Sequence, residues 1–386
     1  MKRIHSIDIT RGLAMIIMAL DHTRDLMHVN SITQSPTDLA TTTPFLFFTR
    51  WITHLCAPTF VFLSGVSAWL SFSKKANIVT SRNFLLSRGL WLIILELTFI
   101  SFAITLDFHL NVLLFQVIGT IGIGFIILAL CLKIPAKILG IVGLLIIFTH
   151  NAVPLIPFAE GSVIKAILSP LFGPAAIPIP HGITLVVGYP PIPWLGIMLA
   201  GFGIGYLFQM PVEYRKNILL KIGIGALLLF VIIRFINIYG DPVPWSAQSS
   251  PLYTFLSFFN LTKYPPSLLF DLPTLGIMFL VLYFSEGTKN KLTTIANVYG
   301  KVPLFYFLVH FYILRIIMLV MMRIQGFKFS DLEIGFNLGR PKATSGVPLF
   351  AIYLIWIAVV IILYPVCKWY GNYKDSHPEK KWLRYL

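Results

Sequence analysis

Long apolar stretches alternate with short polar connections along the whole chain. A helix needs about 20 mostly apolar residues to cross the hydrocarbon core of a bilayer. Ten stretches approach or exceed this length, at 10–29, 50–72, 84–106, 110–132, 136–157, 189–209, 217–239, 265–285, 302–323 and 347–368. The pattern therefore predicts one all-α polytopic membrane domain over residues 1–386, with about ten transmembrane helices.

Composition excludes the soluble classes of protein. The 386 residues are 57% hydrophobic and 12% charged, whereas soluble domains are about 45–50% apolar and about 25% charged. The formal net charge is +15, but the cations lie in short connections and form no basic run interleaved with exposed aromatic residues. The lipid bilayer is therefore the expected partner, and nucleic acid is not.

Charge placement predicts the orientation. Basic residues concentrate in the connections on one side, and these include Lys74, Lys75, Lys133, Arg215 and Lys289. Because Lys and Arg favour cytoplasmic loops, we expect both termini to be cytoplasmic in a multi-pass protein of the plasma or inner membrane. On the other side, connections 158–188 and 240–264 are long and rich in proline and aromatic residues, which favours ordered caps over flexible linkers.

The first stretch carries ionisable residues at both ends. Arg11 and His22 are eleven residues apart, so a helix would place them on one face and about 16 Å apart along its axis. His22 is a candidate general base that Asp21 or Asp25 would orient. The arrangement suits a donor that enters from the cytoplasm and an acceptor presented outside. A structural interpretation stays open, in which Asp8 pairs with Arg11 and the second cluster forms an interfacial salt-bridge patch.

Other polar residues in or beside apolar stretches are further candidates. His54 precedes a kink expected at Pro58, where it would line a cavity or pack against its neighbours. His310 lies in the middle of an apolar stretch, and burying it without a function is costly. Lys263 precedes a helix start and would favour an anion there or serve as an interfacial anchor. No metal is expected, because the His, Cys and carboxylate spacings match no known metal site.

Four segments resemble the heparan-alpha-glucosaminide N-acetyltransferase catalytic-domain family. They are Ser6–His22, Ala57–Gly65, Tyr189–Gly196 and Val302–Tyr306. The spacing of Arg11 and His22 is also similar to that in bacterial membrane acyltransferases that O-acetylate surface polysaccharides. The resemblance implies a ten-helix acyltransferase fold, acetyl-CoA as the donor on the cytoplasmic side, a sugar acceptor on the far side, and a homodimer. In the lysosomal enzyme the catalytic histidine lies further along the first loop, which makes His28 the second candidate base.

The sequence thus predicts a membrane acetyltransferase that moves an acetyl group from acetyl-CoA to a hydroxyl or amine of an extracytoplasmic sugar or glycan. The expected catalytic group is His22, His28, Asp21, Asp25 and His54, and the expected coenzyme-binding group is Arg11, Asp8, Lys263 and His310. The alternative is a proton-coupled transporter for a small anionic solute, in which His22, His54 and His310 relay protons and Arg11 binds the solute. Dependence on acyl-CoA distinguishes the two classes.

Overall fold

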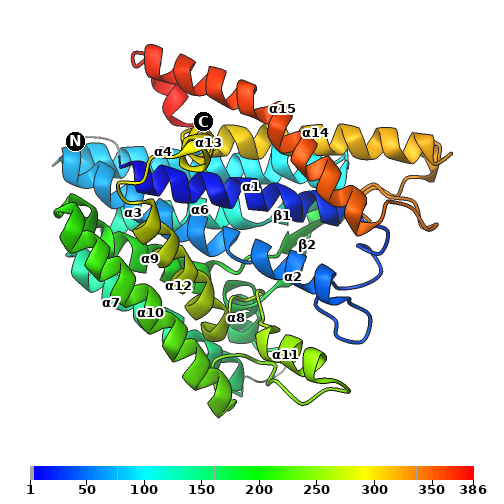
Figure 1. Cartoon of the computed structure of the whole chain (residues 1–386), viewed down its shortest axis with the longest axis horizontal. Coiled ribbons are helices and arrows are strands. Elements are labelled where there is room, and N and C mark those ends of the chain that lie inside the picture. The colour runs from blue at the N-terminus through cyan, green and yellow to red at the C-terminus, as the bar shows by residue number, and fades with distance from the viewer. Residues whose placement is uncertain (1–3, 76, 158, 160, 336) are drawn as a thin grey trace.

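The structure, a computed structural model, describes residues 4–75, 77–157, 159, 161–335 and 337–386. Helices dominate it (Figure 1). They are α1 (His5–Met27), α2 (Pro44–Thr53), α3 (Cys56–Lys75), α4 (Ile78–Leu95), α5 (Ser101–Thr105), α6 (Val117–Cys131), α7 (Ala136–Thr149), α8 (Val163–Phe172), α9 (Pro191–Ile204), α10 (Val212–Ile236), α11 (Pro251–Phe259), α12 (Leu268–Ser285), α13 (Lys291–Gly300), α14 (Pro303–Ile324) and α15 (Leu349–Ser376). The all-α polytopic class predicted from the sequence is confirmed.

Eight helices within the described residues are long and apolar enough to cross a membrane. They correspond to eight of the ten stretches predicted from the sequence. The other two predictions, 10–29 and 110–132, overlap α1 and α6. Helix α1 spans 23 residues but carries several charged side chains, and α6 has only 15 residues. The chain is therefore a polytopic membrane protein whose first helix is unusually polar.

The second predicted stretch, 50–72, is divided between two helices rather than kinked inside one. Helix α2 ends at Thr53 and α3 begins at Cys56, so the chain breaks at His54 and Leu55. Pro58 consequently lies in the first turn of α3, where a backbone N–H would have no helical acceptor. The break turns α2 and its polar face toward the last turns of α1.

A small sheet corrects the prediction that residues 110–132 form one helix. Strand β1 (Val112–Phe115) pairs in parallel with β3 (Ile183–Val187), which pairs antiparallel with β2 (Ala175–Ile179). The described residues of connection 158–188 include α8, β2 and β3. Connection 240–264 contains α11. The apolar residues of β1 resemble a helical span in sequence because a short buried strand and a buried helix share the same hydrophobicity.

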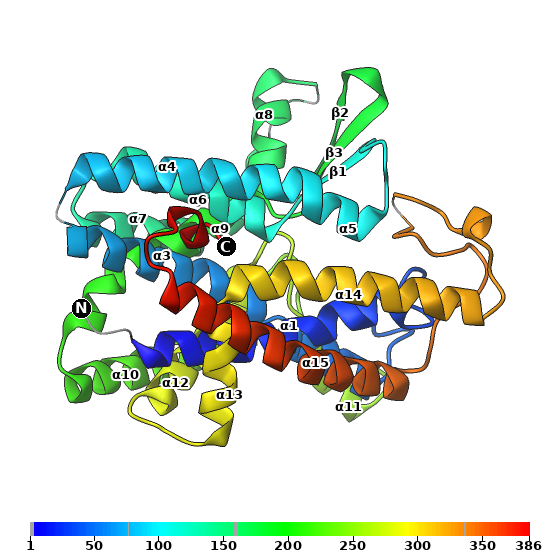
Figure 2. The ribbon, with the colours of Figure 1, turned by 90° about the horizontal axis from the view of Figure 1, so that it is seen from above.

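Helix α1 runs through the middle of the bundle, alongside α14 in both views (Figures 1 and 2). It packs against α2, α3, α12, α13, α14 and α15. Two glycines allow α1 and α13 to touch backbone to backbone. A Cβ on Gly12 would lie 1.7 Å from the Ala296 carbonyl oxygen, and one on Gly300 would lie 1.7 Å from the Asp8 carbonyl oxygen. Close contact of this kind fixes α1 rigidly and so positions its polar residues.

Candidate functional site

Two histidines from helices far apart in sequence meet in the last turns of α1. His22 Nδ1 lies 2.7 Å from His310 Nε2 on α14. The His22 ring stacks on Phe311, with ring centroids 4.2 Å apart, and meets the edge of Phe307 at 6.0 Å. His310 is completely buried, whereas His22 is partly exposed to a cavity. Aromatic packing therefore holds the His22 ring in one orientation.

Hydrogen bonding fixes where the protons of this pair lie. His310 Nδ1 is 3.0 Å from the Tyr306 carbonyl oxygen, which can only accept. Nδ1 of His310 must therefore carry a hydrogen, and its complete burial favours a neutral ring whose Nε2 holds a lone pair. His22 Nδ1 then donates to that lone pair. This chain leaves His22 Nε2 unprotonated, which is the tautomer of a base or nucleophile.

Beside the pair, Asp21 holds together α1 and α2. Its two carboxylate oxygens accept from Arg50 Nη1 at 2.7 and 2.6 Å, and one of them accepts from Thr53 Oγ1 at 2.8 Å. Arg24 Nη2 lies 2.7 Å from the same carboxylate and 2.5 Å from Asp25 Oδ1. We call these five residues the Asp21 network. Buried charges that are paired and hydrogen-bonded in this way stabilise one geometry.

Two connected cavities open at this end of α1. The first, of about 300 Å³, is the His22 cavity; its lining includes Asp21, His22, Asp25, Gln116, Tyr189, Lys263, Tyr264 and Phe311. The second, of about 410 Å³, is the Lys263 cavity; its lining includes Arg24, Asp25, Arg50, His54, Asn260, Lys263 and Tyr264. Asp25, Lys263 and Tyr264 line both. A ligand in the Lys263 cavity would therefore adjoin the His22 ring.

A third cavity lies beside the other half of α1. This Arg11 cavity, of about 90 Å³, is lined by Arg11, Ser64, Arg88 and Phe307 among mainly apolar residues. Phe307 also contacts both histidines, with its centroid 6.0 Å from His22 and 5.7 Å from His310. One aromatic ring thus adjoins both the Arg11 cavity and the pair.

The contacts of Arg11 agree with both interpretations left open by the sequence, because Arg11 pairs with Asp8 and also lines a cavity. Arg11 Nη1 lies 3.7 Å from Asp8 Oδ1, the pairing expected at this spacing. The Arg11 guanidinium also donates to the Leu63 carbonyl at 3.0 Å and to Ser67 Oγ, while it lines the Arg11 cavity. It is thus anchored and still faces a cavity.

The partner that orients His22 differs from the prediction. Asp21 and Asp25 were expected to orient the ring, but Asp21 is bound by Arg50 and Thr53, and His310 occupies the Nδ1 position. Consecutive residues on a helix point about 100° apart, so a neighbour in sequence does not face the same partner. Asp25 lines both cavities but bonds to Arg24.

Two of the proposed coenzyme ligands lie elsewhere than expected. His310 lines none of the three cavities described above, because its ring is enclosed by His22, Tyr306 and Phe311. Lys263 lies at the His22 end of α1, far along the helix from the Arg11 cavity. Neither residue lines the Arg11 cavity.

The structure also separates the two remaining histidines. His28 follows α1, and its carbonyl accepts from Arg340 Nη1 at 2.7 Å; its side chain lines neither the His22 nor the Lys263 cavity. His54 lines the Lys263 cavity and packs on Phe270, with ring centroids 5.2 Å apart. His22 is therefore the better placed base among the predicted candidates.

Sequence reasoning missed the residues that complete the site. Arg50 and Thr53 bind Asp21, Phe307 and Phe311 enclose the histidine pair, and Tyr189 and Tyr264 line the His22 cavity. One signal was available. Arg50 and Thr53 are three residues apart in an apolar segment, so both fall on one helix face that needs a buried acidic partner.

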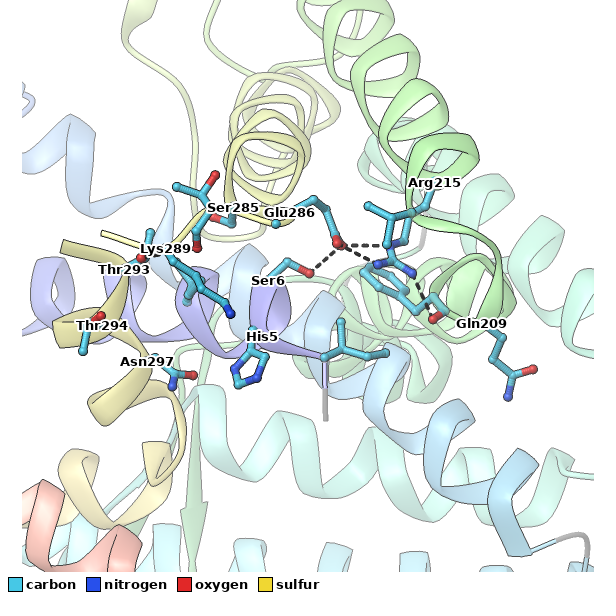
Figure 3. A pocket seen from close by; sticks show the side chains of 16 residues that line it. His5, Ser6, Gln209, Arg215, Ser285, Glu286, Lys289, Thr293, Thr294 and Asn297 are labelled. Carbon is cyan, nitrogen blue, oxygen red and sulfur yellow. Dashed lines mark hydrogen bonds and ion pairs between the residues drawn. The ribbon is translucent and has the colours of Figure 1, made fainter. Parts of the chain in front are cut away.

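A fourth cavity lies at the His5 end of α1 (Figure 3) and has a different character. This His5 cavity, of about 570 Å³, is lined by residues of α1, α10, α12 and α13. Ser6 and Arg215 converge on Glu286, which accepts from Ser6 Oγ at 2.6 Å and from Arg215 Nε at 2.8 Å. Among the described residues no group of three His, Cys, Asp or Glu side chains could hold a metal ion.

Comparison with known families places this geometry in context. Residues 3–236 match the family model described as heparan-alpha-glucosaminide N-acetyltransferase, catalytic. No curated protein matches the chain significantly. The matched segment contains Arg11 and His22 but ends before Lys263 and His310. The chain belongs to this family, and the resemblance drawn from its motifs is confirmed. Family and fold together indicate a membrane-bound transferase.

Proposed function

We propose that this protein transfers an acetyl group from cytoplasmic acetyl-CoA to a hydroxyl or amine of an extracytoplasmic sugar or glycan. One observation carries the proposal: the hydrogen bond from His22 to His310 leaves Nε2 of the neutral His22 ring unprotonated, and His22 lines a cavity. The excess of basic residues near the His5 end of α1 supports a cytoplasmic position for that end. The Arg11 cavity then opens on the donor side and the His22 cavity on the acceptor side.

The residues of the chain divide the chemistry between them. His22 Nε2 accepts the proton of the acceptor hydroxyl or amine, whose oxygen or nitrogen attacks the thioester carbonyl carbon. The C–S bond breaks, and the proton held on His22 passes to the departing thiolate. General base catalysis of this kind contributes about 10²- to 10⁴-fold to the rate. His310 holds His22 in the required tautomer throughout.

The charges and the apolar lining of the donor side suit parts of a coenzyme thioester. Arg11 and Arg88 supply fixed positive charges for the anionic part of the donor, and guanidinium groups bind phosphates well. The apolar lining beyond them, which includes Met15 and Phe125, suits an uncharged arm that reaches toward Phe307. A ring at that position also separates the thioester from water until an acceptor arrives.

Turnover of acetyl-CoA by the purified protein tests the proposal. We expect release of free coenzyme A in detergent when glucosamine is supplied, and formation of the acetylated sugar in equal amount. In proteoliposomes, transfer should require the donor and the acceptor on opposite faces of the membrane. Absence of coenzyme turnover with a panel of hexosamines and neutral sugars would exclude the acetyltransferase and favour the transporter.

A further inference from the structure

Buried donors around the Lys263 cavity lack acceptors. Arg24 is 2% exposed and His54 is 4% exposed, yet Arg24 Nη1 and His54 Nδ1 have no hydrogen-bond partner within the described residues. Both side chains line the cavity. Most buried polar atoms in folded proteins are satisfied, and each exception costs about 1–3 kcal/mol. Such donors around a cavity indicate a ligand that accepts hydrogen bonds.

Lys263 adds a cation to the same cavity without a carboxylate partner. It is 8% exposed, and its ammonium lies over two aromatic rings, 5.1 Å from the centroid of Tyr264 and 5.8 Å from that of Tyr189. No ion pair to Lys263 occurs in the part of the chain that the structure describes. Ring faces only partly replace the hydration of an ammonium group.

The charges of the site leave one cation uncompensated. Arg24, Arg50 and Lys263 face two carboxylates, Asp21 and Asp25, both of which are bound by arginine. Burial alone would raise the pKa of Tyr264, yet the nearby Lys263 and Arg50 charges hold it below its ordinary value. The cavity is therefore electropositive, and one anionic group would neutralise it.

From this geometry we infer that the Lys263 cavity binds an oxyanion, a carboxylate or a phosphate, carried by the acceptor saccharide. Arg24, His54 and Lys263 would donate to its oxygens. Because Asp25, Lys263 and Tyr264 also line the His22 cavity, the reacting hydroxyl or amine of the same molecule would lie at His22. This inference rests on the proposed function for its reaction but not for its binding site.

Matched pairs of acceptors test the inference. Glucosamine 6-phosphate is compared with glucosamine for the phosphate, and glucuronate with glucose for the carboxylate. The wild-type protein should transfer to the acidic member of at least one pair with a kcat/KM at least tenfold higher, mainly through KM. The pair with the larger ratio distinguishes phosphate from carboxylate. Equal kcat/KM values within both pairs would overturn the inference.

Charge variants locate the site. We expect Lys263→Gln to remove most of the preference for the acidic acceptor, measured as the ratio of kcat/KM for the acidic acceptor to kcat/KM for the neutral one, and Lys263→Arg to restore this ratio. Lys342→Gln is the matched control, because Lys342 loses the same charge on an exposed loop outside the cavity. Equal losses of activity on acidic and neutral acceptors in Lys263→Gln would contradict an anion site.

A binding measurement separates this inference from the proposed function. The acidic sugar of the preferred pair should raise the thermal midpoint of the wild-type protein but not of Lys263→Gln, with no donor present. If this difference is observed while acetyl-CoA is not turned over, the anion site in the Lys263 cavity is supported and the proposed acetyltransferase activity is contradicted. If acetyl transfer occurs without a preference for the acidic acceptor, and the acidic sugar stabilises wild type and Lys263→Gln equally, the acetyltransferase activity is supported and the anion site is contradicted. Equal stabilisation by inorganic phosphate and by glucosamine 6-phosphate would contradict recognition of a saccharide.

Discussion

The two ends of α1 each carry a buried charged cluster beside a cavity. The clusters differ in how completely their hydrogen-bonding groups find partners inside the protein. At the His5 end, Glu286 accepts from Arg215 Nε and Nη2 and from Ser6, while Arg215 Nη1 donates to the carbonyls of Phe208 and Met210. At the His22 end, donors of Arg24 and His54 remain without acceptors.

This difference separates a structural cluster from a binding site. An ion pair whose hydrogen-bonding capacity is satisfied inside the protein has nothing left to offer a ligand, whatever the volume of the cavity beside it. The His5 cavity is larger than the Lys263 cavity, at about 570 against about 410 Å³. The smaller cavity nevertheless has the unsatisfied nitrogen atoms of Arg24 and His54, whereas the unsatisfied buried atom in the lining of the His5 cavity is an acceptor, Asn297 Oδ1. The hydrogen-bonding groups that line a cavity, rather than its volume, therefore distinguish the proposed binding site.

The largest expected effect follows from removal of the proposed base, His22. It tests whether the His22 end of α1, rather than the His5 end, is the functional one. His22→Ala should lower transfer by about 10³-fold, because it removes the unprotonated nitrogen of the proposed base from the His22 cavity. Steady-state coenzyme A release and acetyl-sugar formation measure it.

His28→Ala is the control, since His28 lines neither cavity at this end of α1. Retained activity in His22→Ala together with loss in His28→Ala would move the base to the loop and undo the assignment of the His22 end.

The sequence predicted the membrane class and the position of α1 because apolar length and charged residues are local signals. It also identified His22 as a base candidate from charge placement alone. The pairing of His22 with His310 could not be predicted, because the two residues are 288 positions apart and meet only through the packing of α1 on α14. Strand β1 was missed for a related reason, because tertiary contacts rather than local hydrophobicity decide it. The break at His54, in contrast, lies where the missing N–H of Pro58 leaves the His54 carbonyl without a helical donor, close to the kink expected from the sequence.

The second prediction concerns the ion pair of Arg215 and Glu286 at the His5 end of α1. Glu286→Gln leaves the Arg215 guanidinium without its counter-charge at a buried position, and removing one partner of a buried pair costs about 3–5 kcal/mol. Chemical or thermal unfolding in detergent should show this loss, while kcat/KM of the folded fraction stays at the wild-type level.

A double variant, Arg215→Met with Glu286→Leu, should recover most of that stability, because it removes both charges together. A selective loss of donor or acceptor binding in the folded single variant would instead give the His5 cavity a functional role.

A third prediction sharpens the function of His310 as a positioning residue. His310→Leu removes the acceptor for His22 Nδ1, so both tautomers of His22 become accessible and the rate should fall about 10- to 100-fold in kcat, with little change in KM. His310→Gln provides a carbonyl acceptor and should retain more activity than the leucine variant. The pH dependence of kcat should change only in the leucine variant. Equal losses in both variants would reduce His310 to a packing residue.

The smallest expected effect concerns an ion pair that is fully formed but exposed to solvent. Lys342 Nζ lies 2.8 Å from Glu333 Oε1, a shorter contact than Arg11 makes with Asp8, yet the lysine side chain is 84% exposed. Water and salt screen such a pair, and holding two long side chains together costs entropy that offsets the attraction. Lys342→Ala should therefore leave the thermal midpoint and the transfer rate unchanged within error at physiological salt. A measurable loss would show that the number of ion pairs matters more than their burial. The reason to distinguish the two ends of α1 by the completeness of their buried contacts would then disappear.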